Sequence, residues 1–179
     1  PDAGGLNDLA SLDVDNPTAR TRVTLTATGD AAVADVAVHG SLASLTVGGG
    51  IVVTGDVTFE GHVDTLVLAD VGGDGAAAGE QTLTIEGDDE LPVTRATSIT
   101  LGDVTDLSID SAVPIRQLAV ASWTDDETGA ADNVYAPSIA TLISRGAFQA
   151  GLTLNDLGDA AGATVLGRAA VDGPVDEAA

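Results

Sequence analysis

An acidic segment near residue 130 offers the side chains most able to do chemistry. Asp125, Asp126 and Glu127 are followed closely by Asp132. Carboxylate oxygens are the ligands that Ca²⁺ prefers, and the ion takes about six to eight of them. These four residues are therefore candidate ligands of a calcium ion, with a solvated acidic loop as the alternative. No other cofactor is indicated, and the spacing of an EF-hand is missing.

Two aromatic residues, Trp123 and Tyr135, flank this acidic segment. They are candidates for a patch that contacts a sugar or a protein partner. The alternative is that both rings pack over the core at the base of the loop. Aromatic residues make up only 2% of the chain, so any surface for sugar binding would depend on these two.

Paired carboxylates raise the question of an enzyme. Asp103 and Asp106 lie beside one expected strand, and Asp64 occupies an equivalent position on another. A glycoside hydrolase needs two carboxylates roughly 5–9 Å apart in a groove, and it usually offers aromatic platforms as well. Four rings are few for that purpose, and six arginines against 28 acidic residues do not suit a lyase of acidic polysaccharides. We expect the chain not to be an enzyme.

The two histidines, His39 and His62, both lie at turns beside glycine. They are 23 residues apart, which is close to the length of one expected coil, so we expect them to stack on one corner. As metal ligands they would need two or more partners. We interpret them as exposed turn residues.

A recurring six-residue pattern predicts the strands that must position these residues. In each pattern the first, fourth and sixth residues are apolar, and the second, third and fifth are small or polar. The pattern begins at Val33, Leu42, Val63, Ala96, Val104 and Ile115. Repeats at short and nearly regular spacing are typical of a solenoid, in which each unit buries its apolar side by stacking on its neighbours. Glycine-containing connections of two to four residues separate the strand-like pieces.

Spacing distinguishes a β-solenoid from the alternative, an antiparallel β-sandwich. Leu42 and Val63 are 21 residues apart, and Ile115 and Ile139 are 24 apart. Coils of about 19–24 residues fit these distances, and the pattern always repeats in the same sense. A hairpin would instead favour Asn-Gly or Asp-Gly at its tip, whereas Gly-Asp is common here. We predict an all-β, parallel β-helix-like solenoid of roughly eight coils, each rising about 4.8 Å.

The solenoid is expected over residues 21–155. Residues 1–20 are interpreted as a lead-in or N-terminal cap, and residues 156–179 as a C-terminal cap or linker. Three acidic segments interrupt the pattern and are expected to form protruding loops: 72–80, 87–92 and 124–133. Solenoids tolerate insertions of this kind.

The net charge of −22 limits the partners. A surface this negative repels nucleic-acid phosphates and anionic lipid, so we expect neither partner. No run of 18 apolar residues is present, so membrane insertion is not expected. The chain has no cysteine, and stacked coils need no disulfide.

Residues 40–49, GSLASLTVGG, resemble a recurrent string in the large secreted or surface β-strand-repeat proteins of planctomycete-type bacteria. The stretch 136–154 is similar to another recurrent segment of those proteins. The resemblance implies an extracellular or cell-surface β-solenoid module. We expect a filament, sheath or spacer subunit that associates with itself or with neighbouring modules through its solenoid ends. The alternative is an adhesion module that binds carbohydrate or protein, stabilised by calcium.

Overall fold

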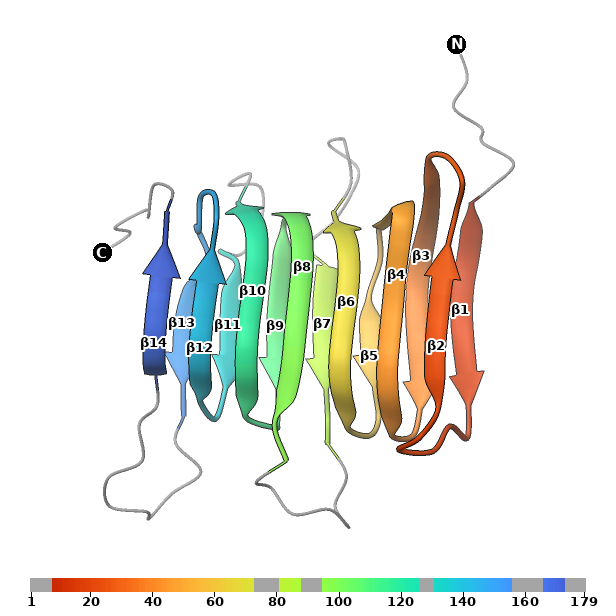
Figure 1. The fold of residues 1–179 in the computed structure, drawn as a ribbon, viewed down its shortest axis with the longest axis horizontal. Helices are drawn as coiled ribbons and strands as arrows, with labels where there is room; N and C mark the ends of the chain where they lie inside the picture. The colour runs from red at the N-terminus through yellow and green to blue at the C-terminus, as the bar shows by residue number, and fades with distance from the viewer. Residues whose placement is uncertain (1–7, 73–80, 88–94, 126–130, 156–165, 173–179) are drawn as a thin grey trace.

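The computed structural model describes residues 8–72, 81–87, 95–125, 131–155 and 166–172. The regular structure of these residues is β-strand, and the strands stack along one axis from β1 to β14 (Figure 1). Their bounds are β1 Leu9–Asp15, β2 Arg22–Thr26, β3 Ala31–His39, β4 Leu42–Val53, β5 Val57–Phe59, β6 Val63–Val71, β7 Gln81–Ile85, β8 Thr97–Thr105, β9 Leu107–Ser111, β10 Ile115–Thr124, β11 Asn133–Ala136, β12 Ile139–Ser144, β13 Gly151–Leu154 and β14 Leu166–Val171.

The strands form two series that lie back to back. The odd-numbered strands pair in the order β1, β3, β5, β7, β9, β11, β13, and the even-numbered strands pair from β2 to β14 in the same way. In Figure 1 the even series faces the viewer and the odd series lies behind it. Every pairing between described strands is parallel, for example β4 with β6 and β7 with β9. The β-solenoid is therefore confirmed, and the antiparallel sandwich is wrong.

Interior side chains stack in columns because neighbouring coils stay in register. One column runs through the whole odd series as Leu12, Val36, Val57, Leu83, Ile109, Val134 and Leu152. A second runs through the even series as Val23, Leu45, Leu66, Ile99, Leu118, Leu142 and Ala169. Their central members are buried. The alternation of apolar and polar residues along each strand produces these columns, because successive side chains point to opposite faces.

A third, narrower side closes each coil. The second half of β4, Ile51–Val53, pairs with the start of β3, and this pairing joins the two series into one sheet. A column of Val33, Val53, Val71, Val104, Trp123 and Phe148 lines this side. Larger rings replace valine toward the C-terminal end, so Trp123 fills a position that valine fills elsewhere.

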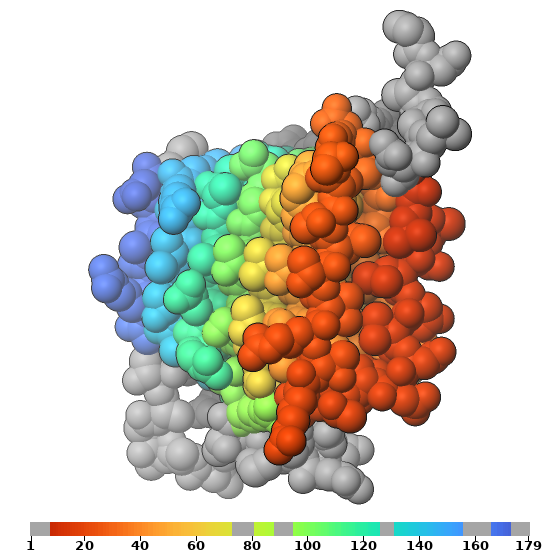
Figure 2. All heavy atoms as spheres, turned by 45° about the vertical axis from the view of Figure 1, so that its right-hand side comes forward, coloured from red at the N-terminus to blue at the C-terminus, as the bar shows by residue number. Residues whose placement is uncertain are grey.

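Successive bands of colour in Figure 2 show the coils as layers stacked from the N-terminal to the C-terminal end. The register confirms two predicted pairs, since Leu42 lies beside Val63 and Ile115 beside Ile139. The solenoid has about six turns, so the expectation of eight coils was too high. The reason is that some of the six-residue patterns belong to the odd series and others to the even series, so two patterns can share one coil.

The strand series extends past the expected limits of 21 and 155. β1 pairs with β3 over residues 9–15, and β14 pairs with β12 over residues 166–171. Both outer segments therefore contribute strands to the stack. The loop segments 72–80 and 87–92 fall almost wholly outside the described residues.

Close contact between coils explains one glycine on the outer side of the even series. A Cβ added at Gly102 in β8 would overlap the carbonyl oxygen of Ala69 in β6. Only a residue without a side chain lets the two backbones approach this closely.

Candidate functional site

The acidic segment near residue 130 is partly described. Asp125 and Asp132 lie together, because the backbone N–H of Asp132 donates a hydrogen bond of 3.3 Å to Oδ2 of Asp125. Asp126 and Glu127, the other two predicted calcium ligands, lie outside the described residues. The calcium site therefore stays a prediction.

Asp132 is the unusual member of this pair, since its exposed fraction is only 2%. Its Oδ2 accepts a 2.8 Å hydrogen bond from the indole Nε1–H of Trp123, and the backbone N–H of Leu107 also bonds to its carboxyl group. The carboxyl group thus links Trp123 of β10 and Leu107 of β9 to the residue that precedes β11.

The pKa of Asp132 is raised to about 7, chiefly by burial, and the neighbouring charges of Asp125 and Asp106 contribute to this rise. The hydrogen bonds from Trp123 and Leu107 act in the opposite direction but are too weak to cancel the cost of burial. Asp132 therefore exchanges its proton near neutral pH, far above the usual range of a carboxyl group.

Trp123 and Tyr135 have opposite environments. Trp123 is fully buried and meets Phe148 edge to face, with ring centroids 5.6 Å apart. Trp123 is thus part of the core and presents no ring surface to a partner. Tyr135 in β11 is 46% exposed on the outer side of the odd series. Of the two predicted interaction residues, only Tyr135 is available on the surface.

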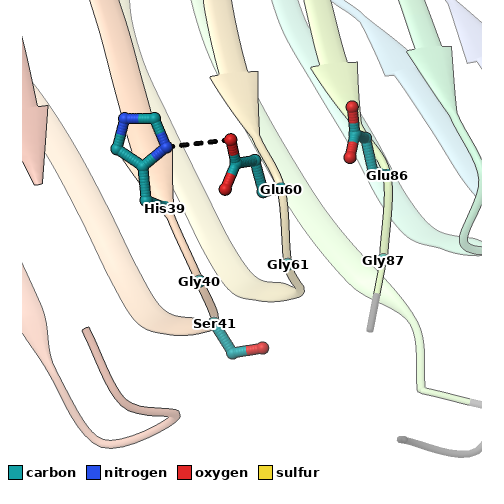
Figure 3. A pocket seen from close by; sticks show the side chains of 7 residues that line it. All are labelled: His39, Gly40, Ser41, Glu60, Gly61, Glu86 and Gly87. Atoms are coloured by element: carbon teal, nitrogen blue, oxygen red, sulfur yellow. Dashed lines mark ion pairs between the residues drawn. The ribbon is translucent and has the colours of Figure 1, made fainter. Parts of the chain in front are cut away.

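A groove lies where the odd strands end, and sequence reasoning did not find it. It has a volume of about 430 Å³, and its lining includes His39, Ser41, Glu60 and Glu86 (Figure 3). His39 Nδ1 lies 2.9 Å from Oε1 of Glu60, and its Nε2 lies 3.2 Å from Oδ1 of Asp13. The register signals this arrangement, because Val38 pairs with Phe59 and Phe59 pairs with Ile85. His39, Glu60 and Glu86 are therefore successive members of one column.

The carboxylates of this corner stabilise the charged imidazolium. Hydrogen bonding and charge of Glu60 raise the pKa of His39, and Asp13 and Asp15 raise it further. The nearest donor atoms of Asp13, Asp15 and His39 lie within 4.8 Å of one another. All three residues are exposed, and both ring nitrogens of His39 already face carboxylates, so the corner is best described as an ion-pair cluster.

The two histidines do not stack, contrary to expectation. His39 lies in register with Glu60, whereas the backbone N–H of His62 donates to Oγ of Ser41 at 3.1 Å. A distance of 23 residues in sequence is misleading here, because Leu42 pairs with Val63 and the true repeat at this position is 21. His39 ends an odd strand, and His62 precedes an even one.

His62 is buried beside a partly exposed ion pair, Asp64 with Arg95, on the even series. Its Nε2 lies 3.1 Å from Oδ1 of Asp64, and Arg95 binds both carboxylate oxygens of Asp64 at 2.9 Å. Burial lowers the pKa of His62, and the positive charges of Arg95 and Arg116 lower it further. Burial disfavours ionised Asp64, but hydrogen bonding and charge of Arg95 outweigh it and lower the pKa of this carboxyl group. Asp64 therefore serves as an ion-pair partner.

The two ends of the stack expose apolar side chains. Leu9 in β1 is 40% exposed, and Leu152 in β13 and Leu166 in β14 are each 37% exposed. A groove of about 340 Å³ at the N-terminal end is lined by Leu9, Leu25 and other mostly small or apolar residues. Among the described residues, β1 and β2 at one end and β13 and β14 at the other have no strand on their outer side.

Comparison with known proteins returned no matching family model, no matching curated protein and no matching solved structure. No helix in the described ranges is long and apolar enough to cross a membrane. The site geometry alone supports the proposals that follow.

Proposed function

We propose that this chain is a structural module that assembles end to end into a filament, sheath or spacer at the cell surface or outside the cell. One observation carries the proposal: both ends of the described stack combine unpaired strand edges with exposed leucines. An unpaired strand edge is a template for pairing with another chain, and exposed apolar area adds a driving force for association.

The direction of the strands permits such an assembly to propagate. All strands within each series run parallel, so a second copy moved along the axis would place its β1 beside β13 and its β2 beside β14. Both new pairs would be parallel, as inside the solenoid, at about 4.8 Å. A contact between different ends of the same molecule does not close on itself, and it generates filaments.

The interior columns would continue across this junction. Leu152 ends the column that starts at Leu12, so in register the next copy's Leu12 follows Leu152. The exposed side chains of Leu152 and Leu166 would then be covered by the first coil of the neighbour. Their burial would contribute about 25 cal/mol per Å² of apolar surface.

One outer column opposes the in-register junction and makes it testable. Arg22 pairs with Ser44 at one end, and Arg168 pairs with Thr141 at the other, at equivalent outward positions. In register, Arg168 would face the neighbour's Arg22. Like charges directly opposite each other across two strands are destabilising by about 0.2–1 kcal/mol. Arg22→Glu would replace this repulsion with an ion pair.

The proposal can be tested by sedimentation velocity and negative-stain electron microscopy over a range of protein and salt concentrations. We expect rods that lengthen with concentration, most readily at about 1 M salt, where the Debye length is roughly 3 Å and repulsion from the net charge is screened. Leu152→Glu should leave single particles, whereas Arg22→Glu should lengthen the rods. Tyr135→Glu is the matched control, because it adds the same charge one coil inside the end, on the outward side of β11 and not on the end surface.

Single particles of wild-type protein at every concentration and salt would refute end-to-end assembly. Equal effects of Leu152→Glu and Tyr135→Glu would show that charge, and not the end surface, controls association.

A second candidate function is an adhesion module, and the exposed ring of Tyr135 favours it. An aromatic ring on a flat sheet face suits contact with a sugar or with a protein surface. Adhesion would be supported over assembly if the protein remained monomeric in sedimentation, bound immobilised glycans, and lost this binding on Tyr135→Ala.

A further inference from the structure

The charges of this protein are segregated between two opposite faces. We call the outward side of the even series the arginine face; it is formed by residues 22–26, 42–48, 63–69, 97–102, 115–121, 139–145 and 166–171. Arg22, Arg116, Arg145 and Arg168 lie on it and are exposed. Asp64 is the one acidic residue in these ranges, and Arg95 binds it at both oxygens.

The arginines of this face lack carboxylate partners. Within the described part of the chain, Arg95 is the one arginine that forms an ion pair. Arg116 donates instead to the backbone oxygen of Ala96 at 2.7 Å. In a chain with 28 acidic residues and only six arginines, guanidinium groups without carboxylates are unexpected. Guanidinium groups match carboxylates in geometry and pair with them through two hydrogen bonds.

Small uncharged side chains occupy the middle of the arginine face. Outward positions of β4 and β8 hold Ser44, Thr46, Ser98 and Thr100, and the two strands flank β6. Such side chains leave the sheet flat and allow another surface to approach closely. Arg22 in β2 lies on one side of this patch, and Arg116 in β10 lies on the other.

The opposite face is acidic. We call the outward side of the odd series, together with the turn residues at its strand ends, the acidic face; its charged members are Asp13, Asp15, Asp35, His39, Asp56, Glu60, Glu86 and Asp110. His39 is its one cationic side chain among the described residues, and it is already paired with Glu60 and Asp13. Glu86 borders the open groove of Figure 3.

We propose that the arginine face of one copy docks side by side on the acidic face of a second copy, through arginine–carboxylate pairs. Charge complementarity favours this occupant, because the surface that fits the unpaired arginines is present on the same chain. Both faces also share one rise per coil of about 4.8 Å, so the charged side chains of either face are spaced by multiples of this rise. The contact joins two different faces, so it is heterologous and independent of the end-to-end junction.

The test uses two double variants in a Leu152→Glu background, which keeps the ends apart. Arg116→Glu with Arg145→Glu reverses the arginine face and leaves the acidic face intact. Glu86→Gln with Asp110→Asn removes two charges of the acidic face and leaves the arginine face intact. Each variant alone has one usable face and should stay single by sedimentation velocity. Mixed in equal amounts, they should form a heterodimer and nothing larger.

We expect the mixture to associate at least about tenfold more tightly than either variant alone. Several exposed ion pairs of about 0.2–1 kcal/mol each are enough for this, because a factor of ten requires about 1.4 kcal/mol. The affinity should fall as salt rises, because exposed pairs are screened.

A second comparison separates docking from overall repulsion. Glu86→Gln with Asp110→Asn removes two negative charges from the acidic face, and Asp70→Asn with Asp103→Asn removes two from the third, narrower side of the coils. Both changes lower the net repulsion equally, yet side-by-side association should weaken in the first variant and strengthen in the second.

Absence of a heterodimer from the mixture would overturn the proposal. The proposal would also be overturned if the wild-type protein showed no self-association but bound an immobilised sulfated polysaccharide, and if reversal of the arginine face abolished this binding. The arginine face would then be assigned to an external polyanion. The side-by-side contact is tested in variants whose ends cannot associate, whereas end-to-end assembly is tested by the rods of the wild-type protein. Either proposal can therefore fail without the other.

Discussion

Replacing Asp132 with asparagine should remove a pH-dependent loss of stability that the buried carboxyl group imposes on the fold. The side chain has an exposed fraction of 2% and accepts a hydrogen bond from Trp123 Nε1. Asparagine keeps the size of the side chain and an oxygen for Trp123, but it carries no charge at any pH. The variant therefore separates ionisation from packing.

The magnitude follows from the pKa of Asp132, which rises from 3.8 to about 7 on folding. Below pH 3.8 both folded and unfolded chains hold the proton, and the carboxyl group imposes no penalty. Between pH 3.8 and about 7 the unfolded chain releases the proton while the folded chain retains it, so the free energy of unfolding falls as the pH rises. At about 1.36 kcal/mol for each pKa unit, the full loss is about 4 kcal/mol and is complete above pH 7.

The assay is urea unfolding of the wild-type protein and Asp132→Asn at a series of pH values from 4 to 8. Trp123 is the one tryptophan of the chain and touches the substituted residue, so its fluorescence reports on the site; circular dichroism reports on the strands. The other carboxyl groups titrate in both proteins, so the difference between the two free energies isolates Asp132. It should change by about 4 kcal/mol in favour of the variant across this range.

Asp125→Asn is the control. Its charge is one cause of the raised pKa of Asp132, so its removal should end the loss at a lower pH and make it smaller. A stability difference between wild type and Asp132→Asn that stays constant from pH 4 to 8 would refute the reasoning, since the folded carboxyl group would then titrate as in the unfolded chain.

Three further predictions concern packing and the ion-pair corner. Phe59→Ala should lower the free energy of unfolding by about 3–5 kcal/mol, measured by urea titration, because Phe59 is fully buried in the stack. Gly102→Ala should cost about 1–3 kcal/mol in the same assay, because the new Cβ overlaps the carbonyl oxygen of Ala69; an unchanged midpoint would show that the coils can separate. His39→Gln should reduce the decline in melting temperature as the pH rises from 6.5, because Glu60 raises the pKa of His39 and its stabilising charge is lost as the pH passes the folded value. Parallel pH profiles of His39→Gln and wild type would contradict the His39 prediction.

The fold could be predicted from the sequence because a parallel stack repeats the same local requirement in every coil. The third residue after Leu42, Val63, Ile115 and Ile139 is always a leucine that faces the core. Such a pattern survives variation in the loops. The number of turns was overestimated because the six-residue pattern looks alike on both series, and only the strand pairing distinguishes them.

Local irregularities could not be predicted in this way. The register shifts between Ile115 and Gln117, so Ile115 pairs with Thr97 and not with Ala96. Asp106 joins β8 to β9 in a left-handed conformation with φ of 55°. The sequence has no glycine at this position that would indicate such a conformation. Both features depend on how one coil packs on the next, and a single sequence contains little information about this packing.

The candidate sites also divide into contacts between residues close in sequence, which could be predicted, and contacts that depend on the register between coils, which could not. Proximity in sequence brought Trp123 and Asp132 together as candidates, and they do touch. The hydrogen bond from the backbone N–H of Leu107 to Asp132 joins residues that lie far apart in sequence. The His39–Glu60 pair arises from neighbouring coils, and only the register between β3 and β5 reveals it.

The stacking of coils also has a mechanical consequence. β1 and β14 lie at opposite ends of the stack (Figure 1), so tension applied through the two chain ends acts along the axis and peels coils away one at a time. Leu45 and Leu66 are stacked neighbours 21 residues apart, so each released coil lengthens the chain by about 70 Å. Because each coil contacts only its neighbours, the protein can yield stepwise under load and rewind when the load is removed.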